Sequence, residues 1–306
     1  MTREKITVPG LLSRKLDGPR ICAVTAYDAT FARLLDQAGV DVLLVGDSLG
    51  MAVQGHRHTL PVTLDDICYH SRAVARSQPR AHICADLPFM SYQISVERAV
   101  ESAGKLLQYG GSESVKLEGG AVWSRHVAAI VAAGIPVMGH LGLTPQSVHS
   151  FGGFRVQGRG EQAEHQLMQD AEALANAGVF AIVLESIPPE LGRRITESVS
   201  VPTIGIGAGP HCDGQVLVCY DLLGLETELR PRFVRRFAEL GQAVTAATRD
   251  YVQDVRAGVF PSAEHCFSPV AGRRTTPTLP DAGETAAEQG SAAGMQEQNA
   301  FDKVSG

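Results

Sequence analysis

Four short apolar runs in this chain each end on a carboxylate, and this repeated pattern restricts the folds open to it. The runs end at Asp47, Asp86, Glu118 and Glu185. Apolar runs of four or five residues are typical of parallel strands buried on both faces. In a parallel α/β barrel, the C-terminal ends of all strands lie at one face, which carries the chemistry. The pattern therefore predicts four carboxylates at one rim, forming a metal site or an acid–base site.

Eight candidate strands alternate strictly with helical segments, which predicts a (β/α)₈ TIM barrel. A doubly wound open sheet is the structural alternative. The expected strands are Ile21–Ala26, Asp41–Gly46, His82–Asp86, Ser114–Glu118, Pro136–His140, Phe180–Glu185, Val201–Ile206 and Val216–Cys219.

Helices are expected between these strands, with Thr63 and Ser95 as N-caps of two of them. The polar segment Leu49–Thr63 is long for a connection between strand and helix, and is either a mobile flap or an ordered irregular loop. The expected helices are Thr7–Leu16, Phe31–Gln37, Leu64–Arg76, Ser95–Tyr109, Val122–Ala133, Gln162–Asn176, Pro188–Val199, Pro231–Leu240 and Val244–Ala257.

The composition changes at Ser268, so a barrel domain is expected over residues 1–267 and a tail over 268–306. The tail contains Pro269, Pro277 and Pro280 and almost no large apolar residue. Such a segment cannot bury enough surface to offset the entropy of ordering it. The tail is therefore predicted to be disordered.

Bulk composition excludes several classes of function. The chain of 306 residues carries a net charge of -6, whereas a nucleic-acid binder would show a basic face. No apolar stretch approaches a membrane span, and the N-terminus lacks an apolar signal core. The six cysteines form no Cys-x-x-Cys pair, which favours small buried thiols over a catalytic or zinc-binding cysteine. A cytoplasmic location is expected.

The strand-end residues suggest specific chemistry. Asp47, Asp86 and Glu118 come from consecutive strands, and oxygen ligands without a His/Cys cluster suit Mg²⁺ better than Zn²⁺. Lys116 shares a strand face with Glu118, and forms either a structural pair with a carboxylate or part of the site. Glu185 lies on the opposite side of the barrel, where a general base could face a metal-bound substrate.

Two further features allow more than one interpretation. His140 ends the fifth strand and is either a hydrogen-bonded structural histidine or a substrate contact. The glycines in 205–209 could suggest a dinucleotide-binding turn, but no clear helix follows them, which favours a tight turn or a close backbone approach. No P-loop, Gly-x-Ser-x-Gly elbow or His-Glu-x-x-His motif is present.

Long ordered motifs carry a resemblance to a known family. These segments are Thr25–Asp28, Val45–Ser48, Ala85–Phe89, Val115–Gly120, Gly139–Ser147, Gly152–Gly160, Ile204–Gly209 and Glu264–His265. From about Ile6 to Phe267 the chain closely resembles the ketopantoate hydroxymethyltransferase family. The tail beyond Phe267 has no counterpart in that family pattern.

The resemblance implies a TIM barrel of the phosphoenolpyruvate/pyruvate superfamily. It also implies transfer of a hydroxymethyl group from 5,10-methylenetetrahydrofolate to 3-methyl-2-oxobutanoate. The product is 2-dehydropantoate, a step of pantothenate biosynthesis that proceeds through a Mg²⁺-stabilised enolate. Members commonly assemble as decamers, so a homo-oligomer is expected.

The family roles carry over by motif. Asp47, Asp86 and Glu118 match the residues that hold Mg²⁺, some of them through water. Asp47, Ser48, Asp86 and Lys116 match the contacts to the oxo acid, and His140 is the further candidate contact. Glu185 matches the proton acceptor of the family.

Two rival functions are open to the same residues. One is another Mg²⁺ enzyme of the superfamily, a lyase or phosphonomutase, although the Lys-Lys-Cys-Gly-His signature of isocitrate lyases is absent. The other is a non-enzymatic barrel that serves as a scaffold. The presence of Lys116 together with four acidic strand ends argues against the scaffold.

Overall fold

The computed structural model describes residues 4–225 and 231–267, and the predicted tail lies outside this range. The chain divides into two compact units, residues 1–251 and 252–306. All eight strands lie in the first unit, and the predicted domain boundary at 267 stays a prediction. Within the described residues, none of the helices has the length and apolar character needed to cross a membrane.

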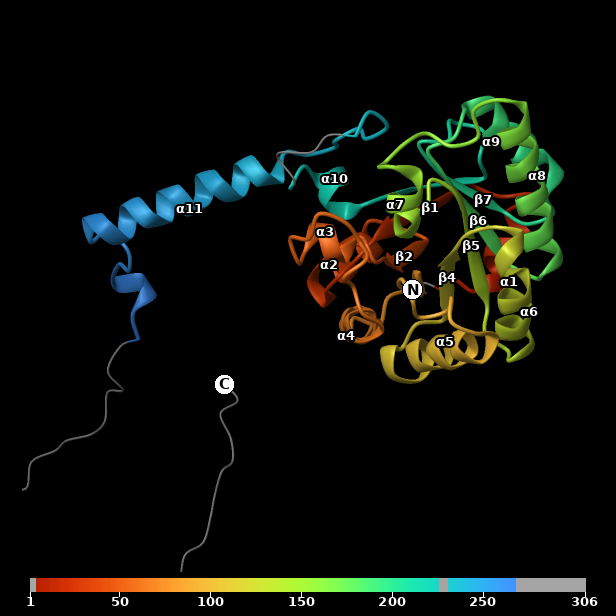
Figure 1. Ribbon diagram of the computed structural model, residues 1–306. Helices are drawn as coiled ribbons and strands as arrows, with labels where there is room; N and C mark the ends of the chain where they lie inside the picture. The colour runs from red at the N-terminus through yellow and green to blue at the C-terminus, as the bar shows by residue number, and fades with distance from the viewer. Residues whose placement is uncertain (1–3, 226–230, 268–306) are drawn as a thin grey trace, which may run out of the picture. The chain divides into compact units, whose positions relative to one another are not determined.

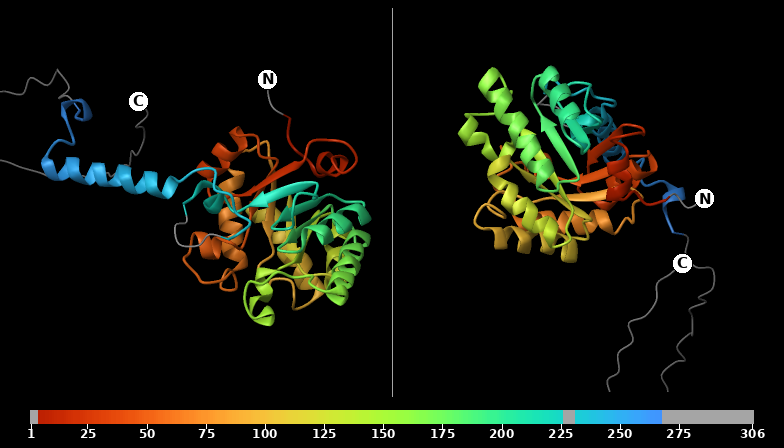
Figure 2. Two further views of the ribbon diagram at one scale, coloured as in Figure 1. Left: turned by 90° about the horizontal axis from the view of Figure 1, so that it is seen from above. Right: turned by 90° about the vertical axis from the view of Figure 1, so that its right-hand side faces the viewer.

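The strands form a closed parallel barrel in chain order, which confirms the predicted fold and excludes the open sheet (Figure 1). The last strand pairs with the first, and the helices lie outside the strands (Figure 2). The strands are β1 (Ile21–Thr25), β2 (Val42–Val45), β3 (His82–Asp86), β4 (Ser114–Glu118), β5 (Val137–Gly142), β6 (Ala181–Glu185), β7 (Thr203–Ile206) and β8 (Gly214–Leu217).

Most predicted helices are confirmed, with their ends shifted by a few residues. Thr63 caps its helix in a capping box with Asp66, and the Ser95 side chain accepts from the backbone N–H of Arg98. The helices are α1 (Val8–Ser13), α2 (Ala29–Gln37), α4 (Leu64–Ala75), α5 (Val96–Gly110), α6 (Ser124–Ala132), α8 (Glu161–Asn176), α9 (Pro189–Ser198) and α11 (Leu240–Ala257).

Short helices replace parts of the expected loops and of the last strand. The segment predicted as a loop from Leu49 contains α3 (Leu49–Ala52), and the glycine-rich segment after β5 contains α7 (Val148–Phe151). The eighth strand ends at Leu217, because Cys219 already begins α10 (Cys219–Leu223). Apolar residues continue across this boundary, so the hydrophobic pattern alone could not place the end of the strand.

The helix predicted over Pro231–Leu240 is wrong. The segment consists of a turn, a bend and irregular backbone until α11 begins at Leu240. The backbone N–H of Phe237 donates to the carbonyl of Leu222, and that of Gly241 donates to Gly224. These hydrogen bonds run to α10 and its C-cap instead of one turn back along the segment, so the chain here does not coil.

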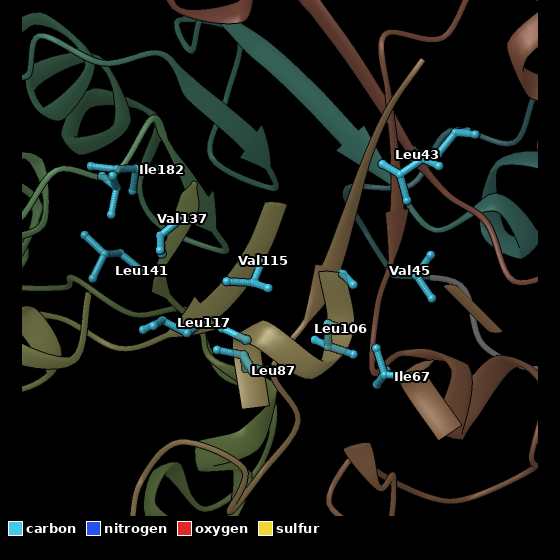
Figure 3. Packing of buried hydrophobic residues seen from close by; sticks show 14 of the residues in the cluster. Leu43, Val45, Ile67, Leu87, Leu106, Val115, Leu117, Val137, Leu141 and Ile182 are labelled. Carbon is cyan, nitrogen blue, oxygen red and sulfur yellow. The ribbon is translucent and has the colours of Figure 1, made fainter. Parts of the chain in front are cut away.

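The core has two layers that follow the alternation of side chains along each strand. Leu43, Val45 and Val115 point outward, where they join Ile67 of α4 and Leu106 of α5 in one buried cluster (Figure 3). The intervening residues fill the barrel interior; they include Val42, Leu44, Cys84, Met138 and Val183.

The six cysteines are free thiols. Cys68, Cys84, Cys212 and Cys219 are buried, as predicted, whereas Cys22 and Cys266 are exposed. Burial raises the pKa of the Cys84 and Cys219 thiols to about 12. Such thiols stay protonated and unreactive near neutral pH, which agrees with a packing role.

His82, at the start of β3, is a buried histidine far from its ordinary pKa. Its Nε2 lies 2.8 Å from Ser114 Oγ, and its ring packs edge-on against Phe180. Burial lowers its pKa to about 4, even though the nearby Glu113 carboxylate acts in the opposite direction. The folded protein therefore holds this ring neutral.

We predict that His82 makes the protein acid-sensitive. The unfolded chain binds this proton near pH 6.5, so the stability contributed by neutral His82 is present above pH 6.5 and is lost as pH falls toward 4. Urea unfolding of the wild type and of His82→Gln should show a stability difference that narrows by about 2 kcal/mol between pH 7 and pH 5. A difference that does not change with pH would contradict this assignment.

Candidate active site

The site begins where β2 ends. The Asp47 backbone N–H donates to Asp86 Oδ2 at 2.9 Å, so the ends of β2 and β3 are tied together. Gly46 permits this approach, because a Cβ there would lie 2.8 Å from Ser48 Oγ and 3.4 Å from Asp86 Oδ2. Ser48 Oγ shares a hydrogen bond of 2.8 Å with the buried Tyr27 hydroxyl. Asp47, Ser48 and Asp86 thus form one corner of the site.

Lys116 on β4 is the buried cation of the site. Its Nζ lies 3.0 Å from Asp86 Oδ1, 4.0 Å from Glu118 Oε1 and 3.2 Å from His140 Nδ1. The barrel register places Asp86 beside Lys116 and Glu118 beside His140. Lys116 therefore pairs with carboxylates, which is one of its two expected arrangements, and its role in the site stays a prediction.

His140 connects two carboxylates across strands β4, β5 and β6. Its Nδ1 lies 3.4 Å from Glu118 Oε1, and its Nε2 lies 3.2 Å from Glu185 Oε2. The Glu185 side chain is 15% exposed, whereas that of Glu118 is 3% exposed. Glu185 is therefore the carboxylate of this group that small molecules can reach from solvent.

The charged groups of the cluster strongly shift one another's pKa values. Burial raises the pKa of Asp47 well above its usual range, and the neighbouring charges of Asp86 and Glu118 raise it further. Burial and Lys116 lower the pKa of His140, but its bonds to Glu118 and Glu185 outweigh them and raise it to about 9. The histidine is thus protonated at neutral pH.

Lys116 and Glu118 keep their charges for related reasons. Burial opposes the charge on Lys116, but the carboxylates of Asp86, Glu118 and Asp47 raise its pKa above the ordinary value. Burial likewise opposes the charge on Glu118, but the His140 hydrogen bond and nearby positive charges lower its pKa. Two buried cations therefore stand among four carboxylates.

Gln146 is a central residue that the sequence reasoning did not single out, although it lies within a motif of the family pattern. Its side-chain Nε2 donates to Asp47 Oδ2 at 2.9 Å, and its backbone N–H donates to Glu118 Oε2 at 2.9 Å. Gln146 lies in a single turn of 3₁₀ helix, η2 (Pro145–Ser147), which is too short to show a periodic pattern. Only its contacts show that it belongs to the site.

The predicted metal ligands come together without forming a ready metal site. Across residues 4–225 and 231–267, no three His, Cys, Asp or Glu side chains form a group that could hold a metal ion. Asp86 instead binds Lys116 and the Asp47 backbone, and Glu118 binds His140 and Gln146. The assignment of Asp47, Asp86 and Glu118 as metal ligands stays a prediction.

The glycines after β7 form a tight turn, as their sequence favours. Gly207 and Gly209 have φ values of 66° and 83°, which L side chains rarely adopt. A Cβ at Gly209 would lie 2.6 Å from that of Pro189. Strand β8 follows the turn, instead of the helix that a dinucleotide-binding turn requires.

Solved structures share this barrel at low sequence identity. A 2,3-dimethylmalate lyase of the PEP mutase/isocitrate lyase superfamily aligns with a TM-score of 0.57 and 17% identity, covering 85% of this chain and 88% of its own. A phosphoenolpyruvate phosphomutase from Streptomyces platensis subsp. rosaceus has a TM-score of 0.57 and 13% identity, covering 86% and 92%. These likenesses confirm the predicted fold class.

Sequence comparison identifies the family. The family model for ketopantoate hydroxymethyltransferase matches residues 5–263. A 3-methyl-2-oxobutanoate hydroxymethyltransferase from Pelobacter propionicus is 54% identical over 87% of this chain and 98% of its own length. The enzyme of that name from Moorella thermoacetica is 56% identical over 87% and 98%. The chain therefore belongs to the ketopantoate hydroxymethyltransferase family and is a transferase.

Proposed function

We propose that this protein transfers a hydroxymethyl group from 5,10-methylenetetrahydrofolate to 3-methyl-2-oxobutanoate, giving 2-dehydropantoate for pantothenate biosynthesis. Curated relatives that share more than half of their aligned residues with this chain carry the name of that activity. The observation that carries the proposal is the chain of contacts from Asp86 through Lys116, Glu118 and His140 to Glu185 at the strand ends.

The reaction requires removal of a proton from C3 of the oxo acid, which is a poor acid in water. Glu185 is the proposed base, because it is the accessible carboxylate of the cluster and its Oε2 is held 3.2 Å from His140. The carbanion equivalent formed in this way, an enolate, then attacks the methylene carbon of the folate. A new C–C bond forms to that carbon, and both of its C–N bonds to the folate break. Water supplies the hydroxyl group of the product, and the two folate nitrogens take up the C3 proton and a proton from water, so that tetrahydrofolate leaves.

The oxo acid binds, in this proposal, at the corner between β2 and β4. The Lys116 ammonium supplies positive charge for the oxygens of the substrate, and it is pre-positioned by Asp86 at 3.0 Å. The Ser48 hydroxyl is half-buried and oriented by Tyr27. Asp47, Asp86 and His140 complete the proposed binding residues.

Mg²⁺ fits the donor set of this corner. Asp86 Oδ1 is buried, and among the described residues its ion-pair partner is Lys116. Hard carboxylate oxygens in excess over buried cations suit Mg²⁺, which usually retains water ligands. Asp47, Asp86 and Glu118 would hold the ion, some of them through water. When bound, it would supply Lewis-acid stabilisation of the negative charge that develops on the substrate.

A lyase or phosphonomutase is the second candidate, and the degree of similarity argues against it. The solved lyase and mutase share the fold at 17% identity or less, whereas relatives named as hydroxymethyltransferases share more than half of the aligned residues. A homodecamer, as the family resemblance implies, and a cytoplasmic location, as expected from the sequence, belong to the same proposal.

We predict that Glu185→Gln slows proton removal by about 10²- to 10⁴-fold, the usual contribution of a general base, with little change in oxo-acid binding. The measurement is exchange of the C3 proton of 3-methyl-2-oxobutanoate in D₂O with Mg²⁺, followed by NMR without folate. Glu190→Gln on the surface of α9 is the control. A rate of C3 proton exchange near that of the wild type in Glu185→Gln would exclude Glu185 as the general base.

Asp86→Asn should weaken binding of Mg²⁺ and of the oxo acid together, because one carboxylate is assigned to both. We expect the Mg²⁺ dissociation constant to rise by more than about tenfold, since the loss of a residue that only hydrogen-bonds to a metal ligand already has an effect of that size. Calorimetric titration measures both constants. Asp65→Asn, an exposed partner of Lys105, is the matched control, and an unchanged Mg²⁺ titration in Asp86→Asn would reject the ligand assignment.

A further inference from the structure

Gln146 connects the ends of three barrel strands, although it comes from the turn after a fourth. Its Nε2 donates to Asp47 Oδ2 beyond β2 at 2.9 Å and to the Leu87 carbonyl beyond β3 at 3.0 Å. Its backbone N–H donates to Glu118 Oε2 at the end of β4 at 2.9 Å. The residue is 6% exposed, so these bonds form out of contact with bulk water.

The orientation of the Gln146 amide is fixed by its neighbours. Both groups that face Nε2, the Asp47 carboxylate and the Leu87 carbonyl, can only accept hydrogen bonds. On the other side, Oε1 accepts from Gln93 Nε2 at 3.2 Å. It also lies 3.2 Å from the Tyr92 hydroxyl, which shares its single proton with the Glu118 carbonyl at 2.8 Å. A flipped amide would set oxygen against oxygen, so the side chain presents a donor to Asp47.

The three carboxylates assigned to the cation are held by different kinds of partner. Asp86 faces the Lys116 ammonium at 3.0 Å, and Glu118 faces the His140 ring at 3.4 Å. Asp47, by contrast, has the neutral amide of Gln146 as its side-chain partner among the described residues. A neutral donor orients a carboxylate without cancelling the charge that a cation needs.

We infer that Gln146 is the positioning residue that holds Asp47 and Glu118 in register for a divalent cation. This inference rests on the proposed function, because the cation is part of that proposal. An ammonium in this place would neutralise Asp47, and a carboxylate would add a repelling charge beside it. In this inference Gln146 is assigned no contact with the substrate, so its effect passes through the two carboxylates to which it donates.

The test uses the full chain and Mn²⁺ as the probe, with free Mn²⁺ measured by EPR in the absence of substrates. Gln146→Met keeps the length of the side chain and the backbone bond to Glu118 but removes the donor to Asp47. We expect the Mn²⁺ dissociation constant to rise about 10- to 100-fold, the usual effect of a residue that orients a metal ligand. Gln93→Met is the control, since it removes a donor behind Oε1 and leaves both Nε2 bonds in place.

A double-mutant cycle separates positioning from a general structural effect. With Asp47→Asn as background, adding Gln146→Met should change Mn²⁺ affinity by about twofold or less, because the oriented carboxylate is already gone. An unaltered Mn²⁺ affinity in Gln146→Met, or an undiminished effect in the Asp47→Asn background, would overturn the inference. Absence of Mn²⁺ binding to the wild type would instead overturn the metal assignment of the proposed function.

Folding of each variant is checked by circular dichroism and thermal melting in EDTA. Should Gln146→Met not fold, Gln146→Asn takes its place, because it keeps a polar amide but is one methylene too short to reach Asp47 Oδ2 in the same backbone. The same weakening of Mn²⁺ binding is expected for this variant, and its absence would overturn the inference in the same way.

Discussion

A buried ammonium is the interaction on which the rest of the site depends. Lys116 Nζ lies within 4.0 Å of Asp86 and Glu118, and its charge also acts on Asp47. Like charges this close are stable in a protein interior only when a cation offsets them, and removing one partner of such a buried pair typically costs about 3–5 kcal/mol. Lys116 therefore lets three carboxylates occupy adjacent strand ends before any ligand arrives.

The packing of the barrel and the placement of the site follow from the same alternation. Cys84 and Asp86 share one face of β3, as Met138 and His140 share one face of β5. Cys84 and Met138 fill the barrel interior, so the residues two positions later, Asp86 and His140, lie on the same face nearer the rim. Because the side-chain period is two, a slip of one residue would turn Asp86 outward toward the helices.

This alternation also explains how far the sequence could predict the molecule. Strand ends such as Asp86 and Glu118 are marked by the apolar run before them, and Thr63 is marked by the helix that it caps. The segment 231–240 could not be predicted, because its Phe237 backbone N–H bonds to Leu222 of α10, a partner that no local pattern reveals. Gln146 was missed for the same reason: its role lies in contacts with three other strands.

The distribution of partners among the carboxylates has a consequence for ligand binding. Burial and the charges of Asp86 and Glu118 raise the pKa of Asp47 well above its usual range, and the Lys116 charge and the neutral Gln146 amide offset this only in part. A proton and a cation then compete for this carboxylate, because metal ligands must be deprotonated. The arrangement that keeps Asp47 free of a cationic side chain thus links the proposed Mg²⁺ binding to proton release.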